Sequence, residues 1–484
     1  MKTKSAREVG LFYGVIAGMS GAFGIEFFTL LEHSALLAGP AVILSLLLCG
    51  ILNMLTMFTY CELGTSISRL GSEYTFTKAS FGGFISFLTG WLRWVACIFT
   101  VALSAIGFGQ MMNYFLPVNT QLVAIFIIIL FTVLNIRGIR QLDLVVIAVF
   151  VSVFAIFDTA SLLQGLTAKS FEPFMPNGLM GALAGVMYSF SIFFGVRTIV
   201  VESPNMENPE RNVPRSIFFS SLSLIVIYCS VAFFVVGAVE FPVETSIPLL
   251  TLAAERLMGP IGGALLNVAG ISAAVMSMTT AMSVQTSIIS AMSRDGYMPK
   301  IVLMTRSRFG TRYVAVILGS ILAILFAASG LAVFVGYVVN FTSLLIFAIV
   351  NLSLIRLRKL MPRLIRPFKT PLYPYTPIVG ALVGFALLIF VESTVLALGI
   401  EFILITIIVY HLRMVGYSRL RLAIGGINFG ISGLIALFLC LLRLKIMELP
   451  WLVADELYLS YSAAVMSVLF FLAGVLNLNS KKKT

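Results

Sequence analysis

Long apolar runs separated by short polar loops form the main pattern along this chain. One membrane crossing takes about twenty apolar residues. By this length the pattern predicts about fourteen membrane-spanning helices. The chain is therefore expected to be an all-α polytopic membrane protein. The expected helices cover 10–32, 38–62, 82–115, 120–136, 144–166, 178–203, 215–239, 258–292, 313–329, 331–355, 373–392, 394–412, 420–442 and 457–478.

Composition supports this fold class. Hydrophobic residues make up 60% of the 484 residues and charged residues only 11%, which leaves too little charge to cover a soluble domain. The net charge of +12 is dispersed among short loops, so a nucleic-acid partner is not expected. The five cysteines lie in or beside apolar spans without CxxC spacing, and neither a disulfide framework nor a zinc site is predicted.

The basic residues predict the orientation of the helices. If the N-terminus is cytoplasmic, 26 of the 32 basic residues fall in cytoplasmic loops or tails, as the positive-inside rule requires. Both ends of a multi-pass protein of the cell membrane are then cytoplasmic, with residues 1–9 before the first span and a basic tail at 479–484. Lys2, Lys4 and Arg7 precede an apolar run without a cleavage pattern, which is typical of an uncleaved first span.

Four glycines interrupt the first expected span, at Gly14, Gly18, Gly21 and Gly24. Glycine costs about 1 kcal/mol relative to alanine in a helix interior, so the four indicate either an unwound segment or a face on which another helix packs closely. Glu26 follows two residues after the last glycine, and ionisable groups inside a membrane are usually functional. The spacing alone leaves both readings open.

The sixth expected span repeats this feature, because Gly195 is followed two positions later by Arg197. Paired glycine-interrupted spans in two halves of a chain indicate a transporter of two inverted repeats, with substrate bound at the broken helices. The repeats would cover 10–166 and 178–356, and 373–478 would add four accessory helices. Unwound backbone offers N–H and carbonyl groups to the carboxylate and ammonium of a zwitterion.

Several motifs resemble those of the amino acid–polyamine–organocation superfamily of permeases. Tyr60-Cys61-Glu62-Leu63-Gly64-Thr65 followed by Gly71-Ser72-Glu73-Tyr74 is similar to the Y-x-E-L-G-[ST]…G-G-x-Y of that family. Asn208-Pro209-Glu210-Arg211-Asn212-Val213-Pro214-Arg215 and Ala291-Met292-Ser293-Arg294-Asp295-Gly296 resemble its N-P-x-R-x-[IV]-P-[RK] and A-M-[AS]-R-D-G. The resemblance, from about residue 8 to 370, implies a leucine-transporter fold of five-plus-five inverted repeats with broken first and sixth helices, and amino acid transport.

Candidate site residues follow from the breaks and from this resemblance. Glu26 and Arg197 depart from the family pattern, and we expect them to pair across the two broken helices; the alternative is that each meets a different partner, Glu26 with Arg93 or Arg197 with a freed helix carbonyl. Arg93 could instead pair with Glu62, Asp158 could be a structural cap, and hydroxyls can simply join helices. The substrate-binding candidates are Gly18, Met19, Ser20, Gly21, Ala22, Gly24, Phe190, Phe193, Phe194 and Gly195, and the coupling or gating candidates are Glu26, Arg93, Asp158, Arg197, Thr279 and Ser283.

The function predicted from these features is secondary-active amino acid transport by alternating access, coupled to protons. Sodium coupling, or exchange of amino acids or polyamines, stays open, as do the transported amino acid and the oligomeric state. A membrane enzyme is disfavoured because two distant histidines and scattered acids form no catalytic cluster. A channel is disfavoured because the sequence contains no repeated motif that would form a ring-like selectivity filter. No catalytic residue, metal or cofactor is expected; the partners are an amino acid and the lipid bilayer.

Overall fold

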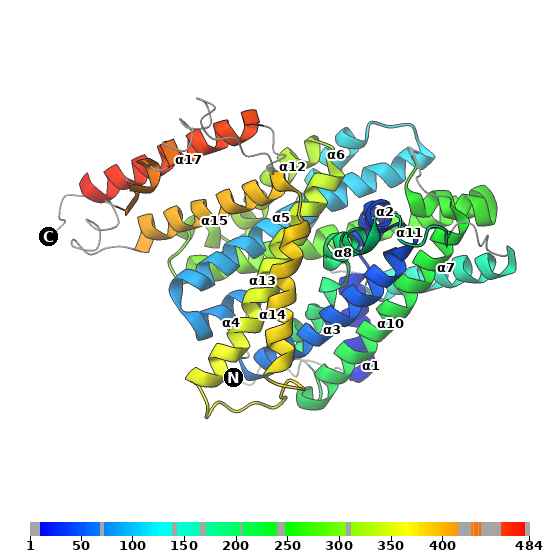
Figure 1. The fold of residues 1–484 in the computed structure, drawn as a ribbon, viewed down its shortest axis with the longest axis horizontal. Helices are drawn as coiled ribbons and strands as arrows, with labels where there is room; N and C mark the ends of the chain where they lie inside the picture. Colours follow the sequence, from blue (N-terminus) through cyan, green and yellow to red (C-terminus); the bar gives the residue numbers. More distant parts are fainter. Residues whose placement is uncertain are drawn as a thin grey trace.

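The computed structural model describes residues 10–67, 72–137, 143–164, 171–203, 206–239, 247–305, 311–414 and 456–479, with short pieces at 427–428, 430–433 and 435–436. All the helices and turns in these ranges belong to one bundle without an extended strand (Figure 1). The elements are α1 (Leu11–Ala22), α2 (Ile25–Ala38), η1 (Gly39–Ala41), α3 (Val42–Ser66), α4 (Ser72–Phe81), α5 (Gly83–Phe115), α6 (Thr120–Ile136), α7 (Asp143–Gln164), α8 (Gly178–Tyr188), η3 (Phe190–Arg197), α9 (Thr198–Glu202), α10 (Pro209–Ala238), α11 (Leu249–Arg294), η5 (Lys300–Leu303), α12 (Tyr313–Ala328), α13 (Ala332–Leu360), α14 (Tyr375–Leu387), η6 (Leu388–Phe390), α15 (Ser393–Met414) and α17 (Glu456–Asn479).

The protein is a polytopic membrane protein. Six helical stretches in the described residues are long and apolar enough to cross a membrane, and other apolar helices are shorter. Many large apolar side chains on the outside of the bundle are exposed, Phe12 and Leu122 among them. In a protein with so little surface charge, a lipid environment accounts for such a surface.

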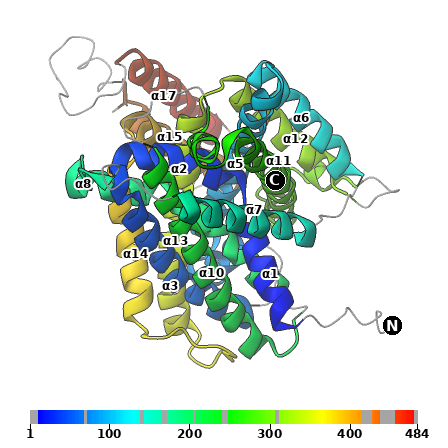
Figure 2. The same cartoon turned by 90° about the vertical axis from the view of Figure 1, so that its right-hand side faces the viewer.

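Close packing between long helices holds the centre of the bundle together. The long helix α5 packs most extensively against α11, α3 packs along α10, and α1 also lies on α10, as the two views agree (Figures 1 and 2). One large hydrophobic core runs through all of these helices. At the edge of the bundle α17 lies on α15 and forms a small separate apolar cluster around Met466 and Phe470.

Several expected boundaries need correction. The polar connection expected at 63–80 contains a helix, α4, which the low hydropathy of SEYTFTKASF concealed. The eighth span begins earlier, because α11 continues through a bend at Gly259 (φ 68°) and Pro260 into a preceding helical segment. The seventh begins at Pro209, where proline suits the first turn of a helix. Most of the expected span at 420–442, like the termini 1–9 and 480–484, lies outside the described residues.

Candidate functional site at the two interrupted helices

The first predicted interruption lies at Phe23 and Gly24. Here α1 ends and α2 begins with Gly24 in an extended conformation (φ −116°, ψ 172°). The Ala22 carbonyl, which loses its helical partner, accepts a hydrogen bond from the Tyr228 hydroxyl of α10 at 2.9 Å. The break is thus held by a neighbouring helix, because freed backbone groups inside a membrane need partners.

The glycines of α1 serve helix packing. A Cβ on Gly18 would lie 2.5 Å from the Ile199 side chain, and one on Gly21 would lie 2.5 Å from the Gly195 carbonyl oxygen. Conversely, a Cβ on Gly195 would overlap the carbonyl group of Gly21. Both readings left open by the sequence are therefore correct, at different glycines: Gly14, Gly18 and Gly21 allow close packing, and Gly24 forms the break.

The second interruption is longer than a single residue. Instead of unwinding at Gly195, the chain runs from α8 into the 3₁₀ segment η3 and then into α9. Asn340 of α13 braces the start of this segment, donating to the Tyr188 carbonyl at 2.7 Å and accepting from the Ser191 N–H at 2.7 Å. Asn53 of α3 donates to the Phe190 carbonyl at 3.2 Å. Neither asparagine is among the residues predicted for the site.

Aromatic side chains surround both interruptions. The Tyr228 ring stacks on Phe27 at 4.2 Å and meets Phe193 edge-on at 5.4 Å. Phe23 stacks on Phe150 of α7 at 5.0 Å. The predicted substrate residues Phe190, Phe193 and Phe194 are all buried, so aromatic side chains make up much of the surroundings of the breaks.

The expected pair between Glu26 and Arg197 is not formed in this structure. Glu26 accepts a hydrogen bond from Ser277 of α11 at 2.8 Å, and no ion pair joins it to an arginine in the described residues. Arg197 turns toward Glu73 of α4, with 3.6 Å between Nη1 and Oε1. The prediction failed because the sequence places α4 in a loop, where Glu73 would have been in water.

Glu73 is buried between two arginines. Arg93 Nε of α5 lies 3.9 Å from the same Oε1 atom that faces Arg197. These separations exceed hydrogen-bonding distance, and the three atoms Glu73 Oε1, Arg93 Nε and Arg197 Nη1 have no hydrogen-bond partner. The Arg197 guanidinium lies 4.3 Å from the centre of the Phe194 ring. We call Glu73, Arg93 and Arg197 the central charge cluster.

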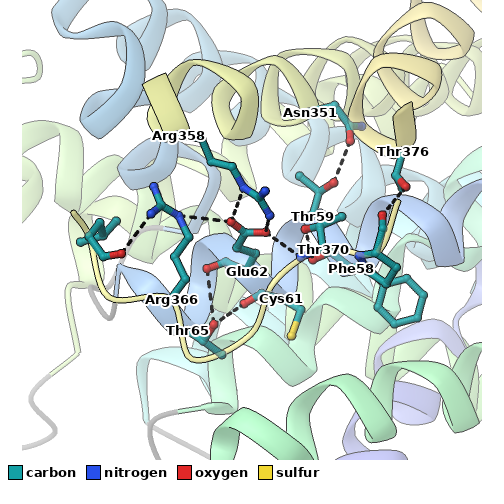
Figure 3. Close-up of polar contacts among 12 residues, drawn as sticks. Phe58, Thr59, Cys61, Glu62, Thr65, Asn351, Arg358, Arg366, Thr370 and Thr376 are labelled. Carbon is teal, nitrogen blue, oxygen red and sulfur yellow. Dashed lines mark hydrogen bonds and ion pairs between the residues drawn. The ribbon is translucent and has the colours of Figure 1, made fainter. Parts of the chain in front are cut away.

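A second cluster of one glutamate and two arginines lies at the end of α3 (Figure 3). Glu62 accepts two hydrogen bonds from Arg358, at 2.8 and 2.6 Å, and a third from the Thr370 N–H at 2.7 Å. Arg366 Nε is 3.3 Å from the carboxylate. This end cluster joins α3, the end of α13 and the following loop. Glu62, considered above as a partner for Arg93, is therefore bound to Arg358 and Thr370 instead.

The remaining coupling candidates are Asp158, Thr279 and Ser283. Asp158 of α7 accepts from Ser230 of α10 at 2.7 Å. Ser283 is exposed, and its hydroxyl donates to the Thr279 carbonyl one turn earlier at 2.9 Å. The α11 hydroxyl that reaches α2 belongs to Ser277, which the prediction omitted because helical spacing alone did not fix the inward face.

Asp295 explains one of the sequence motifs. It follows α11, accepts from Tyr74 and from Lys78 of α4, the latter at 2.7 Å, and so ties α4 to the end of α11. Burial alone would raise the pKa of Asp295, but the hydrogen bonds from Lys78 and Tyr74 outweigh it and hold the pKa below its ordinary value.

A cleft of about 730 Å³ opens elsewhere, between the end of α5, the turn from α12 to α13 and the start of α15. Its lining includes Gln110, Leu331, Phe334 and Glu392, and none of the predicted site residues. The described residues contain no group of histidine, cysteine and acidic side chains that could hold a metal ion.

Comparison with known proteins agrees with these features. A family model described as amino acid permease matches residues 9–412. The chain belongs to this family. It is 26% identical to the branched-chain amino acid permease BcaP of Bacillus subtilis (strain 168), over 86% of this chain and 94% of that relative. It is 25% identical to the methylthioribose transporter of the same organism, over 78% and 87%, and 23% identical to a probable GABA permease of Pseudomonas aeruginosa, over 74% and 81%.

Proposed function

We propose that this chain is a secondary-active transporter that moves amino acids across the cell membrane by alternating access. The observation that carries the proposal is the direct backbone contact of two interrupted helices at Gly21 and Gly195. In the proposed architecture, 10–166 and 178–356 are inverted repeats within about fourteen helices, and both termini are cytoplasmic. A substrate at such a site changes the packing of both helices at once.

The substrate class is an amino acid, with apolar side chains favoured. Buried aromatic rings around the breaks, such as Phe23, Phe193 and Tyr228, suit an apolar side chain, and one relative carries the name branched-chain amino acid permease. Another relative is named a methylthioribose transporter, so that compound belongs in the binding panel.

Glu26 is the residue proposed to carry the coupled proton. It lies in the first turn of α2 and is hydrogen-bonded to neutral Ser277 at 2.8 Å, with Tyr228 and Arg93 as the other ionisable groups facing it. A carboxylate inside a membrane without a paired cation gains from taking up a proton. A proton there would weaken the link between α2 and α11.

Uptake into proteoliposomes tests the function. Leucine accumulation driven by an imposed pH gradient, and saturable with concentration, is expected for the wild-type protein, and Glu26→Gln should lose the gradient dependence while retaining leucine binding. Glu210→Gln, an exposed acid on α10, is the matched control. Downhill flux alone would indicate a channel, and uptake that needs sodium but ignores pH would exclude proton coupling.

A further inference from the structure

The central charge cluster holds an excess of positive charge inside the protein. One carboxylate, Glu73, faces two guanidinium groups, and the exposed fractions of the three side chains are 2% for Glu73, 6% for Arg93 and 15% for Arg197. A buried charge without full compensation is costly. Within the cluster itself, two guanidinium groups face one carboxylate; the other carboxylate that faces Arg93 is Glu26, which is hydrogen-bonded to Ser277.

Its hydrogen-bonding capacity is also unfilled. Arg93 Nε and Arg197 Nη1 are buried without a hydrogen-bond partner. Glu73 is held at 3.6 and 3.9 Å, whereas charge-assisted pairs between arginine and a carboxylate close to about 2.7–2.9 Å. Glu73 thus leaves one donor of each guanidinium group without a hydrogen bond.

The position of the cluster connects it to the transport site. Arg197 is the last residue of η3, two residues beyond Gly195, and its guanidinium lies over the Phe194 ring at 4.3 Å. Arg93 approaches the same ring at 5.9 Å. Both guanidinium groups therefore lie close to Phe194, the neighbour of Gly195, where the two interrupted helices are in contact.

The other anion-binding position at the breaks is already filled. The N-terminus of α2 attracts negative charge, but the Glu26 carboxylate folds back over it, so that a Cβ on Gly24 would overlap Glu26 Oε2. A substrate carboxylate that cannot use this terminus needs another cationic partner near the breaks.

We propose that Arg93 and Arg197 bind a carboxylate group of the transported molecule, which takes the place beside the two arginines that Glu73 holds loosely. This inference rests on the proposed function. It identifies the side chains that bind the carboxylate of the substrate, which the proposed function does not name. The carboxylate comes either from the α-carbon or from an acidic side chain of an amino acid, and the two sources are separated by their amides.

Ligand-induced thermal shifts of the purified full-length protein test the proposal with four probes, leucine, leucinamide, glutamate and glutamine. In the wild type, leucine should outbind leucinamide if the α-carboxylate is recognised, and glutamate should outbind glutamine if the side chain is. Arg93→Gln and Arg197→Gln should each reduce that preference about 10- to 100-fold, and Arg197→Lys should restore part of it. Arg137→Gln, an exposed arginine, should keep it.

Glu73→Gln distinguishes recognition from a structural role. Removing the competing carboxylate should tighten binding of the preferred acid about tenfold, whereas a purely structural Glu73 would give weaker binding. A preference that survives in both arginine variants, or its absence in a wild type that still transports leucine, overturns this proposal and leaves the transport function standing. A wild-type protein that neither binds nor transports any amino acid overturns both.

Discussion

The two clusters of one glutamate and two arginines have the same composition and opposite geometry. In the end cluster both oxygens of Glu62 accept hydrogen bonds at 2.6–2.8 Å, although Arg366 Nε, 3.3 Å from the carboxylate, is buried without a hydrogen-bond partner. In the central cluster the Glu73 Oε1 atom stands at 3.6 and 3.9 Å from its arginines and accepts no hydrogen bond. A buried carboxylate whose two oxygens both accept hydrogen bonds fixes the structure around it, whereas the arginines beside a carboxylate that accepts none at its facing oxygen can bind a ligand instead.

The greatest loss of stability is expected from a substitution in the end cluster. Glu62→Gln leaves Arg358 and Arg366 without their carboxylate, and the free energy of unfolding should fall by about 3 kcal/mol. Thermal unfolding in detergent measures this loss, with Glu210→Gln as an exposed control. A loss under about 0.5 kcal/mol would show that the end cluster does not stabilise the fold.

The next largest effect is expected from a substitution that displaces the central charge cluster without changing any charge. Gly195→Ala puts a Cβ into the Gly21 carbonyl group, so η3 must shift and carry Arg197 with it. Transport should fall by about 10- to 100-fold, measured as initial uptake rate per inserted protein. Gly10→Ala has no atom within 4 Å of its new Cβ and should transport normally; equal rates in both variants would remove the contact from the mechanism.

A smaller effect is expected when a ligand is added to variants of the two clusters. Glu73→Gln and Glu62→Gln should both lower the melting temperature without ligand, but a saturating carboxylate ligand should raise it by more in Glu73→Gln than in Glu62→Gln, because only there does the ligand also supply the missing charge. Melting curves with and without the preferred acid measure the effect. Equal recovery in the two variants would contradict the assignment of different roles.

The smallest effect concerns Asp295, whose lowered pKa links stability to pH. Because the pKa lies below its ordinary value, the stabilising contribution is present at neutral pH and is lost as the pH falls through the folded-state pKa. Asp295→Asn should cost about 0.5 kcal/mol at pH 7, since Lys78 and Asp295 are partly exposed. Unfolding at pH 7 and pH 3.5 should show the difference from wild type shrinking at the lower pH; a constant difference would exclude this linkage.

Hydrophobic pattern predicted most helices of this protein within a few residues. The expected 82–115 and 120–136 are α5 (Gly83–Phe115) and α6 (Thr120–Ile136), because the length and apolarity of a membrane helix are local properties. The glycine interruptions at Gly24 and near Gly195 were also visible, since a glycine within an apolar run is a local signal. The short helix α4 escaped, because its polar sequence resembles a loop.

Partners of charged groups could not be read from the sequence. Arg197 is 124 residues from Glu73 in the chain, and they meet only because α4 folds back against the bundle beside η3. The same holds for Ser277, which reaches Glu26 from a helix whose inward face depends on packing. The membrane helices, their glycine breaks and the family follow from local composition and residue order, which the sequence contains directly. The pairing of each carboxylate with an arginine follows from the folded arrangement, because burial and the distance between helices set the energy of a charge pair.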